Sequence, residues 1–453
     1  MMKLPNDFIS RYQAIFKDEF EAFIKGFDLP RSYGLRINPF KCPDISTNPY
    51  LSSILRKNPL VEDGYYYDEI VKPGLHPYHF AGVYYIQDPS AMMVVENADI
   101  KPGEVVFDMC GAPGGKSTHI LSKLQDKGLL ITNDILPKRA KVLSENIERW
   151  GRSNSIVIST DPTQLKDEFY GYFDKVIVDA PCSGEGMFRK DPEIIENWSV
   201  KKIKACSLVQ RSLLDAAYNL VKENGIIIYS TCTFAPEEDE EVLAYFLEKY
   251  PDLELLPTIK GEGIQDGLGE YKACSRFYFH RFNGEGHFIA KIRKTSPTPT
   301  YRKSKSKSLK PIIKEQQALL NEFIDCCLTD FSLNYPIYEF NNHLYTLETD
   351  EQVPNLDGIN ILRYGLHLGE VKKDRFEPSH ALALRLSKDQ VKHYVDFPHD
   401  SKEIRQYLKG ETITYPGNNH FTLITVDGYS LGWAKHVDSL LKNYYPKGLR
   451  IVL

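Results

Sequence analysis

The stretch that decides the fold runs from Val105 to Thr118 and reads Val-Val-Phe-Asp-Met-Cys-Gly-Ala-Pro-Gly-Gly-Lys-Ser-Thr. An apolar strand leads into a glycine-rich turn, and the turn opens a helix. Glycines let the backbone approach a ligand closely, and the amino end of a helix favours anionic or polar groups. The segment therefore predicts a ligand-binding loop at the carboxyl end of a strand.

Strands and helices alternate around this loop from about residue 104 to residue 292. The expected strands are 104–108, 129–133, 156–159, 175–179 and 226–230, and the expected helices are 117–125, 137–150, 201–221 and 236–249. This alternation predicts a parallel sheet covered by helices on both faces. A late strand over 287–292 follows a Gly-Glu-Gly turn, and we expect it to pair antiparallel at the sheet edge.

The flanking regions carry weaker patterns. Apolar spacing predicts a helix over 8–27, alternation predicts a strand over 35–38, and Asp88 before Pro89 indicates a helix start. Residues 294–311 contain six basic residues, three prolines and no acid, which predicts a solvated linker that could add phosphate contacts. A helix near 314–327 and hairpin turns at 417–419 and 427–428 are expected after it.

Composition limits the class of protein. The 453 residues predict about three domains, and 42% hydrophobic with 26% charged residues is typical of a globular chain. The longest apolar runs are far shorter than the ~18 residues of a membrane span, and the first residues lack a secretory pattern. Eight cysteines without a C-x-x-C pair disfavour a disulfide scaffold or zinc ribbon and indicate a reducing cytoplasm. The net charge of −5 gives no support for nucleic-acid binding, so any evidence for such binding must come from local features of the sequence.

Two kinds of ligand compete for the glycine loop. A Walker A loop needs G-x-x-x-x-G-K-[ST], and here Gly111 to Gly115 is one residue too short, although 175–179 resembles a Walker B strand. A site for a nucleoside-type cofactor instead has an acidic residue at the end of the second strand, where it binds the ribose hydroxyls. Asp134 stands there, and Asp161 after the third strand could accept an exocyclic amine. The pattern therefore favours a nucleoside-type cofactor over a nucleoside triphosphate.

Two cysteines follow neighbouring predicted strands, Cys182 after the fourth and Cys232 after the fifth. Ligands sit beyond the carboxyl ends of such strands, so both thiols should point at one crevice. A thiolate that adds to carbon 6 of a pyrimidine makes carbon 5 nucleophilic toward a sulfonium methyl. Asp179 is placed near ring nitrogen 3, where a carboxyl group that is protonated or shares a proton would assist the addition of the thiolate. The second thiol can then act as the base that removes the carbon 5 proton in the elimination. The other six cysteines are interpreted as structural.

These residues closely resemble the Nop/Sun family of RNA cytosine-5 methyltransferases, over residues 30–292. The motifs in the family's order are Asp108-x-Cys110-x-x-Pro113-Gly114-Gly115-Lys116, Asp134, Asp161, Asp179-Ala-Pro-Cys182-Ser-Gly and Thr231-Cys232, with 36–41 and 87–90 resembling its N-terminal motifs. The resemblance implies an α/β fold with a Rossmann-like S-adenosylmethionine-dependent methyltransferase core, built on a mostly parallel seven-stranded sheet.

The same resemblance assigns roles to residues. It implies Cys232 as the nucleophile, Cys182 as the thiol that helps release the product, and Asp179 as the group that activates the base. It implies that Lys116 contacts the target base. It also implies S-adenosylmethionine as the cofactor, bound by Cys110, Gly111, Ala112, Pro113, Gly114, Gly115, Lys116, Asp134, Arg139, Asp161 and Asp179. No metal is expected, because no cluster of His, Cys and Asp residues has the spacing of a metal site.

The C-terminal part resembles, more loosely, the tail of bacterial small-subunit rRNA members of the family (RsmF-like), which ends in a PUA-like RNA-binding barrel. Residues 432–435 and 441–448 carry that likeness. The predicted domains are an N-terminal α+β RNA-binding domain over 1–85, the catalytic domain over 86–294, a basic linker over 295–310, an intermediate C-terminal α+β domain over 311–375 and the PUA-like domain over 376–453.

The resemblance implies methylation of carbon 5 of a cytosine in 16S rRNA, with rRNA or the 30S subunit as partner, by a cytoplasmic monomer without membrane contact. The alternatives are the same chemistry on tRNA or 23S rRNA, a non-catalytic RNA-binding assembly factor, and nucleoside triphosphate hydrolysis. The target cytosine must leave its stack. The acidic run 236–241 is interpreted as a helix start that complements the helix dipole. Candidate phosphate contacts are Arg36, Arg189, Lys190, 302–310 and 435–447.

Overall fold

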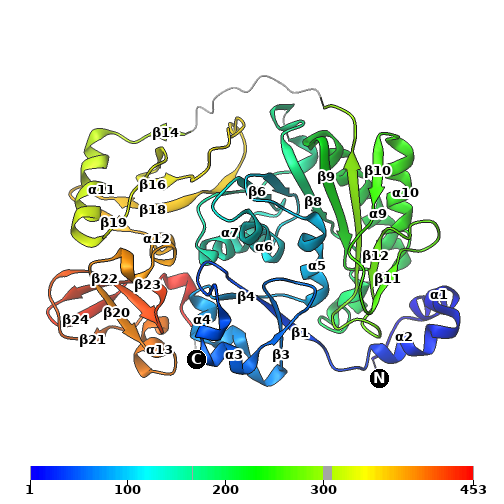
Figure 1. Ribbon diagram of the computed structural model, residues 1–453, viewed down its shortest axis with the longest axis horizontal. Coiled ribbons are helices and arrows are strands. Elements are labelled where there is room, and N and C mark those ends of the chain that lie inside the picture. Colours follow the sequence, from blue (N-terminus) through cyan, green and yellow to red (C-terminus); the bar gives the residue numbers. More distant parts are fainter. Residues whose placement is uncertain (1, 166, 299–308, 452–453) are drawn as a thin grey trace.

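The structure is a computed structural model that describes residues 2–165, 167–298 and 309–451. Within these ranges the largest sheet has ten strands in the order β11-β12-β13-β9-β8-β5-β6-β7-β17, with β10 paired to β13 (Figure 1). Five central strands run parallel, as the alternation predicts. They are β5 (Val105–Asp108), β6 (Leu129–Asn133), β7 (Ser155–Ile158), β8 (Phe173–Asp179) and β9 (Val221–Thr231).

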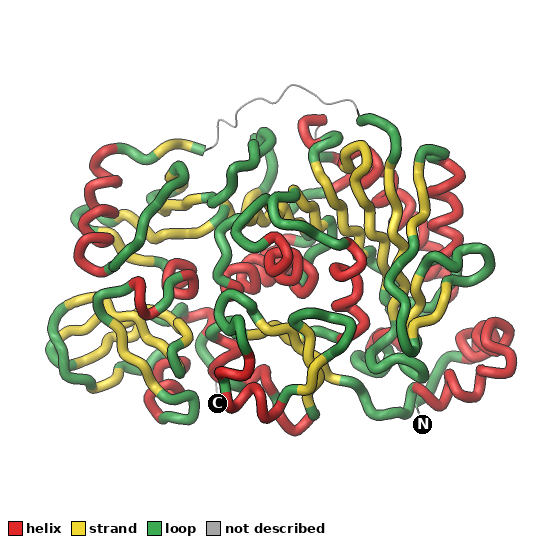
Figure 2. The backbone as a smooth tube through the Cα atoms, in the orientation of Figure 1, coloured by secondary structure: helices red, strands yellow, loops and turns green. Residues whose placement is uncertain are grey.

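Helices cover both faces of this sheet, because successive side chains of each buried strand point to opposite sides. On β5, Val106 packs with the helices α5 (Pro89–Ala98), α6 (Gly115–Leu124) and α7 (Pro137–Trp150). The next residue, Phe107, packs in the other core cluster with α9 (Val200–Leu220) and α10 (Glu240–Lys249). Figure 2 shows the strands between these two layers of helices. The Rossmann-like arrangement expected from the resemblance, a parallel sheet between two layers of helices, is confirmed.

The edges of the sheet differ from the prediction. β13 (His287–Lys294) pairs antiparallel with β9 as expected, but it is not an edge strand. β12 (Ser275–Phe277) and β10 (Leu253–Leu256) pair along its other side, and β11 (Ile264–Asp266) follows β12. At the far edge, β17 (Ile361–Tyr364) pairs antiparallel with β7. The sheet has ten strands instead of the predicted seven. The sequence does not reveal the additional strands, because each has too few residues to show an alternating pattern.

The N-terminal part has two pieces. The helix predicted over 8–27 is broken into α1 (Asn6–Phe16) and α2 (Phe20–Gly26) by a 3-10 turn. A four-stranded sheet follows, in the order β2 (Arg56–Lys57), β3 (Gly64–Tyr67), β1 (Tyr33–Ile37) and β4 (Tyr84–Ile86), with the short helices α3 (Pro49–Ile54) and α4 (Pro77–Phe80) beside it. Asp88 caps α5 as predicted, because its carboxylate accepts a hydrogen bond from Ser90 N at 2.8 Å.

The C-terminal part contains two further five-stranded sheets. The first is β14 (Lys310–Pro311), β15 (Ile337–Phe340), β16 (His343–Thr346), β18 (Leu366–Val371) and β19 (Phe376–Pro378), with α11 (Lys314–Cys327) and α12 (His380–Arg385) beside it. The second is β20 (Tyr394–Phe397), β22 (His420–Val426), β23 (Tyr429–Val437), β24 (Leu440–Asn443) and β21 (Ile413–Thr414), with α13 (Lys402–Lys409). The helix predicted near 314–327 is confirmed.

The two predicted hairpin turns have different outcomes. Asp427 and Gly428 join the antiparallel strands β22 and β23 with positive φ angles of 48° and 85°, as a tight hairpin requires. The turn at 417–419 is no hairpin, because it joins β21 to β22 and these strands are not neighbours. In the part of the chain that the structure describes, no helix is both long and apolar enough to cross a membrane.

The contact between β17 and α7 supplies a stability test. Arg363 is buried, pairs with Glu148 and donates to Ser144 Oγ at 3.2 Å. Arg363→Ala leaves the Glu148 carboxylate without its counter-charge, so we expect a loss of about 3 kcal/mol in the free energy of unfolding by chemical denaturation. The control is the double variant Arg363→Met with Glu148→Gln, which should recover most of the lost free energy of unfolding because no carboxylate is left unpaired. An unchanged value for Arg363→Ala would contradict this packing.

Candidate active site

A cavity of about 660 Å³ lies at the carboxyl ends of the parallel strands β5, β6, β7, β8 and β9. It contains both thiols and carboxylates from three different strand ends. The predicted site residues that line it are Cys110, Ala112, Asp134, Arg139, Asp161, Asp179, Cys182 and Cys232. The remaining ones, Gly111, Pro113, Gly114, Gly115 and Lys116, form the loop and helix start beside it. The structure therefore brings most of the predicted residues to one crevice.

The glycine loop is shaped by close backbone contacts. Gly111 N donates to Asn133 O at 2.7 Å, and a Cβ on Gly111 would lie 2.2 Å from the Thr132 hydroxyl, so a side chain has no room there. Asp108 at the end of β5 is buried and accepts from Ser117 Oγ at 2.5 Å. Burial raises the pKa of Asp108 to about 7, against the opposing hydrogen bond from Ser117. These contacts fix the loop between β5 and α6.

Acidic residues follow β6 and β7 at the cavity wall, where they can bind the polar groups of a nucleoside. Asp134 at the end of β6 accepts from Leu136 N at 3.0 Å, and its carboxylate lies 3.3 Å from Arg139, which also donates to Ala112 O at 3.0 Å. Asp161 follows β7 and accepts from Thr163 N at 3.0 Å. Carboxylates at these strand ends suit ribose hydroxyls and an exocyclic amine. The same carboxylates would repel a triphosphate, which argues against the Walker-type alternative.

Asp179 is the most strongly held carboxylate of the cavity wall. Its Oδ2 lies 2.7 Å from Lys116 Nζ, and its Oδ1 accepts from Ser230 Oγ at 2.8 Å. Burial would raise the pKa of Asp179, but Lys116 and His287 outweigh it and hold this pKa well below its usual range. Burial likewise opposes the Lys116 ammonium, and the Asp179 charge overcomes it and raises the Lys116 pKa. Asp179 is thus a carboxylate that shares a Lys116 proton, not a protonated acid.

The two thiols touch. Cys182 Sγ and Cys232 Sγ are 3.2 Å apart, and Gly186 N donates to Cys232 O at 2.9 Å. The contact with Cys232, together with burial, raises the pKa of Cys182 well above its ordinary value. Cys182 is therefore held in its protonated form.

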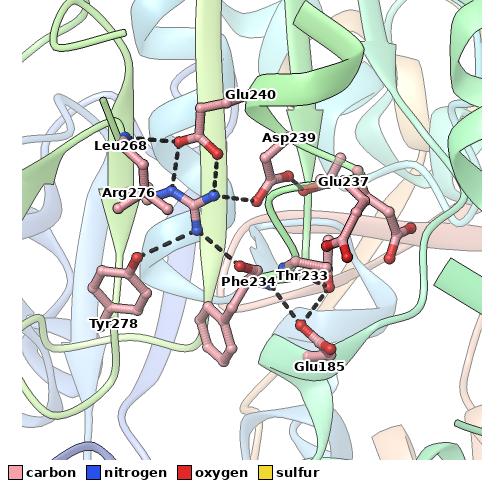
Figure 3. A network of polar contacts seen from close by, with 12 residues as sticks. Glu185, Thr233, Phe234, Glu237, Asp239, Glu240, Leu268, Arg276 and Tyr278 are labelled. Carbon is pink, nitrogen blue, oxygen red and sulfur yellow. Dashed lines mark hydrogen bonds and ion pairs between the residues drawn. The ribbon is translucent and has the colours of Figure 1, made fainter. Parts of the chain in front are cut away.

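Buried carboxylates hold the loops that carry these thiols (Figure 3). Glu185 accepts from Thr233 Oγ1 at 2.8 Å and Phe234 N at 3.0 Å, and also from Tyr12 OH. Trp198 Nε1 donates to the same carboxylate at 2.8 Å. Side chains from the N-terminal helix and from both thiol loops thus meet on one buried glutamate.

The acidic run 236–241 lies at a helix start, as predicted, but it also supplies buried carboxylates with specific partners. Glu240 and Glu241 do lie in the first turn of α10, which begins at Glu240 rather than 236. Arg276 donates to Glu240 at 2.7 Å and lies 3.0 Å from Asp239, and all three side chains are buried (Figure 3). Asp239 in turn accepts from Thr231 Oγ1 at 2.6 Å, next to Cys232.

Two of the candidate phosphate contacts are wrong. Arg36 is fully buried and donates to Gly115 O and to Gln87 Oε1, each at 2.6 Å, so it anchors the start of α6. Arg189 is buried against Glu285 at 2.9 Å. Lys190 and several lysines of 435–447 are exposed, and 302–308 lie outside the described residues.

Sequence reasoning missed several side chains of the site. His287 and Ser230 face Asp179, and Glu185 and Glu238 hold the thiol loops. Glu238 belongs to the acidic run 236–241, but that pattern predicts only a helix start. The other three belong to no run or spacing that predicts such a role, because each contact joins residues far apart in sequence. Among the described residues, no group of three or more His, Cys, Asp and Glu side chains is arranged to hold a metal.

The parallel sheet, the glycine loop and the acids at the strand ends define an S-adenosylmethionine-dependent methyltransferase. Solved structures agree. A methyltransferase homologue from Pyrococcus horikoshii is 28% identical over 65% of this chain and 96% of its own, with a TM-score of 0.57. The NSun6 structure from Pyrococcus horikoshii shares the fold, with 23% identity, 64% and 98% coverage and a TM-score of 0.56.

The chain belongs to the RsmF family of methyltransferases. Residues 4–89 match the N-terminal domain of 16S rRNA methyltransferase RsmF, and 96–293 match 16S rRNA methyltransferase RsmB/F. Residues 322–386 match the first C-terminal domain of RsmF, and 394–451 match its PUA domain. Ribosomal RNA small subunit methyltransferase F of Shewanella piezotolerans is 30% identical over 95% of this chain and 93% of its own. The Shewanella loihica protein of that name is 29% identical, with 99% and 96% coverage.

Glu238 gives a pH-dependent test of the packing around the thiols. Its Oε2 accepts from Ser183 N and Gln210 Nε2, each at 2.9 Å. Burial, only partly offset by these hydrogen bonds, raises the Glu238 pKa to about 7, against ~4.3 for an unfolded glutamate. Between these values the folded protein keeps a proton that the unfolded chain has lost, so this group lowers stability as pH rises.

Glu238→Gln imitates the protonated form and removes this pH dependence. From pH 5 to pH 8, the free energy of unfolding of the variant should rise relative to the wild type by about 2 kcal/mol, measured by denaturation at each pH. The comparison cancels the similar contribution of Asp108, which both proteins share. A difference that stays constant with pH would contradict a protonated Glu238 in the folded protein.

Proposed function

We propose that this protein methylates carbon 5 of a cytosine in small-subunit rRNA with S-adenosylmethionine as methyl donor. The observation that carries the proposal is the pair of thiols 3.2 Å apart, beside the ionised Asp179 and the nucleoside-type cavity. Methyl transfer to a heteroatom needs no such thiol pair, whereas a pyrimidine carbon becomes nucleophilic only after a thiolate adds to the ring. The names of the relatives support 16S rRNA as the substrate.

The residues of the cavity fit the cofactor. Asp134 suits the ribose hydroxyls, Asp161 suits the adenine amine, and Arg139 braces the loop through Ala112. Bound there, S-adenosylmethionine supplies an electrophilic sulfonium methyl group. The proposed binding residues are Cys110, Gly111, Ala112, Pro113, Gly114, Gly115, Lys116, Asp134, Arg139, Asp161 and Asp179.

The thiols divide the reaction between them. Following the motif order of the family, we assign Cys232 as the nucleophile that adds to carbon 6 of the cytosine, and the raised pKa of Cys182 fits a thiol that acts later as a proton donor. Asp179 and Lys116 face the pyrimidine edge and hold its orientation. In the elimination, the departing Cys232 sulfur takes the Cys182 proton across their 3.2 Å contact, and the Cys182 sulfur takes the proton of carbon 5. Cys182 thereby releases the methylated product.

The remaining parts of the chain fit an enzyme that acts on folded RNA. We assign RNA binding to the N-terminal domain over 1–85 and the PUA-like domain over 376–453, with 86–294 catalytic and 311–375 between them. The expected state is a cytoplasmic monomer, in keeping with eight unpaired cysteines. The 30S subunit is the expected form of the substrate.

Transfer of labelled methyl from S-adenosylmethionine tests the proposal directly. Naked 16S and 23S rRNA, assembled 30S subunits and tRNA are assayed in parallel, with Cys232→Ala as the control. We expect label on 16S rRNA or 30S subunits, recovered as 5-methylcytosine and lost in the variant. Label only on tRNA or 23S rRNA would keep the chemistry and reject the substrate. No label on any RNA would favour a non-catalytic RNA-binding factor.

The division of roles between the thiols predicts opposite behaviour of two variants. Cys182→Ala should accumulate a covalent protein–RNA adduct, because product release stalls after Cys232 has added to the base. Cys232→Ala should form no adduct and show no turnover. Denaturing gel electrophoresis of each variant with RNA and S-adenosylmethionine measures both. An adduct that persists in Cys232→Ala would reverse the assignment.

A further inference from the structure

His287 lies directly behind the carboxylate that faces the cytosine. It is the first residue of β13 and only 5% exposed, and its Nε2 lies 3.8 Å from Asp179 Oδ1. That nitrogen is buried and has no hydrogen-bond partner among the residues that the structure describes. A buried imidazole nitrogen that faces a carboxylate without a settled hydrogen bond is poised to bind or release a proton.

The addition step needs a proton at Asp179. When the Cys232 thiolate bonds to carbon 6, the electron pair of the carbon 5–carbon 6 bond shifts toward carbon 4 and ring nitrogen 3. Nitrogen 3 must then take up one proton. Asp179 itself has none to give, because it is ionised beside Lys116. The proton must therefore reach nitrogen 3 through a group that contacts Asp179.

Among the residues that the structure describes, Lys116, Ser230 and His287 approach the Asp179 carboxylate, and His287 suits this task best. Lys116 is held as an ammonium by the ion pair, which raises its pKa. The Ser230 hydroxyl donates a hydrogen bond at 2.8 Å but does not ionise near neutral pH. A histidine exchanges a proton in that range.

We propose that His287 is a positioning residue that supplies and recovers the nitrogen 3 proton through Asp179. In the addition step the Nε2 proton passes to Asp179 Oδ1, and Asp179 delivers a proton to nitrogen 3. In the elimination step nitrogen 3 returns its proton to Asp179 and His287 as the carbon 6–sulfur bond breaks. The net proton count of this relay is zero in each turnover. The inference rests on the proposed cytosine methylation.

The surroundings of His287 leave Asp179 as the charged group that faces it within ion-pair distance. Lys116 lies on the far oxygen of the same carboxylate, at 2.7 Å. On the flanking strands, β12 places Phe277 opposite His287, and β9 supplies the hydroxyls of Ser230 and Thr231. The relay therefore depends on the proton at His287 Nε2 and on its approach to Asp179.

The test compares His287→Gln with Ser230→Ala. Glutamine keeps an N–H near Asp179 but cannot store or pass on a proton, whereas Ser230→Ala removes a donor to the same oxygen and leaves the relay intact. We expect His287→Gln to lower kcat about 10- to 100-fold with KM changed less than threefold. Ser230→Ala should lower kcat less than His287→Gln does. His287→Asn is measured in parallel and decides the result if the glutamine variant does not fold.

The outcomes separate this inference from the proposed function. Wild-type protein that forms no 5-methylcytosine would reject the function before any variant is read. A His287→Gln protein with wild-type kcat, or with a change confined to KM, would overturn the relay and leave the proposed function standing.

Discussion

Parallel pairing of β8 with β9, with Asp179 opposite Ser230, is the constraint on which the active site depends. This register brings the loops after the two strands to one side of the sheet and sets Cys182 and Cys232 in contact. A slip of one residue would turn Asp179 to the other face of the sheet and separate it from Lys116. The chemistry of a thiol pair beside a carboxylate is therefore a consequence of backbone register.

Buried charges keep that register rigid beyond the strands. Glu185 and Glu238 hold the loop after Cys182, and Arg276 with Asp239 holds the loop after Cys232. Partners for these carboxylates come from distant segments, including Tyr12 of α1. Buried carboxylates without such partners would cost several kcal/mol each, so α1 and the late strands are part of the catalytic support. The same low-dielectric surroundings strengthen the Lys116–Asp179 pair and raise the pKa of Cys182.

Much of this could be predicted from local pattern. The strand over 129–133 and the helix over 137–150 match the structure to the residue, and the glycine loop and both cysteines lie at the predicted strand ends. The failures are long-range. The sequence predicts Arg36 as a phosphate contact, but its side chain is buried and donates to the backbone carbonyl of Gly115, which is distant in sequence. His287 carries no sequence signal because its function depends on a strand pairing between β13 and β9. The short strands β10, β11 and β17 depend on pairing with other strands of the large sheet, and such pairing cannot be predicted from their own sequences.

Peptide mapping of an adduct on the wild-type protein tests the central claim most directly. RNA that carries 5-fluorocytosine can accept the thiolate and the methyl group, but it has no proton on carbon 5 to lose, so elimination stops with both thiols intact in the protein. Proteolysis and mass spectrometry then identify the modified cysteine. The account predicts a methylated fluorocytosine on the peptide that contains Cys232. The same adduct on the peptide that contains Cys182, or on any other cysteine, would contradict it.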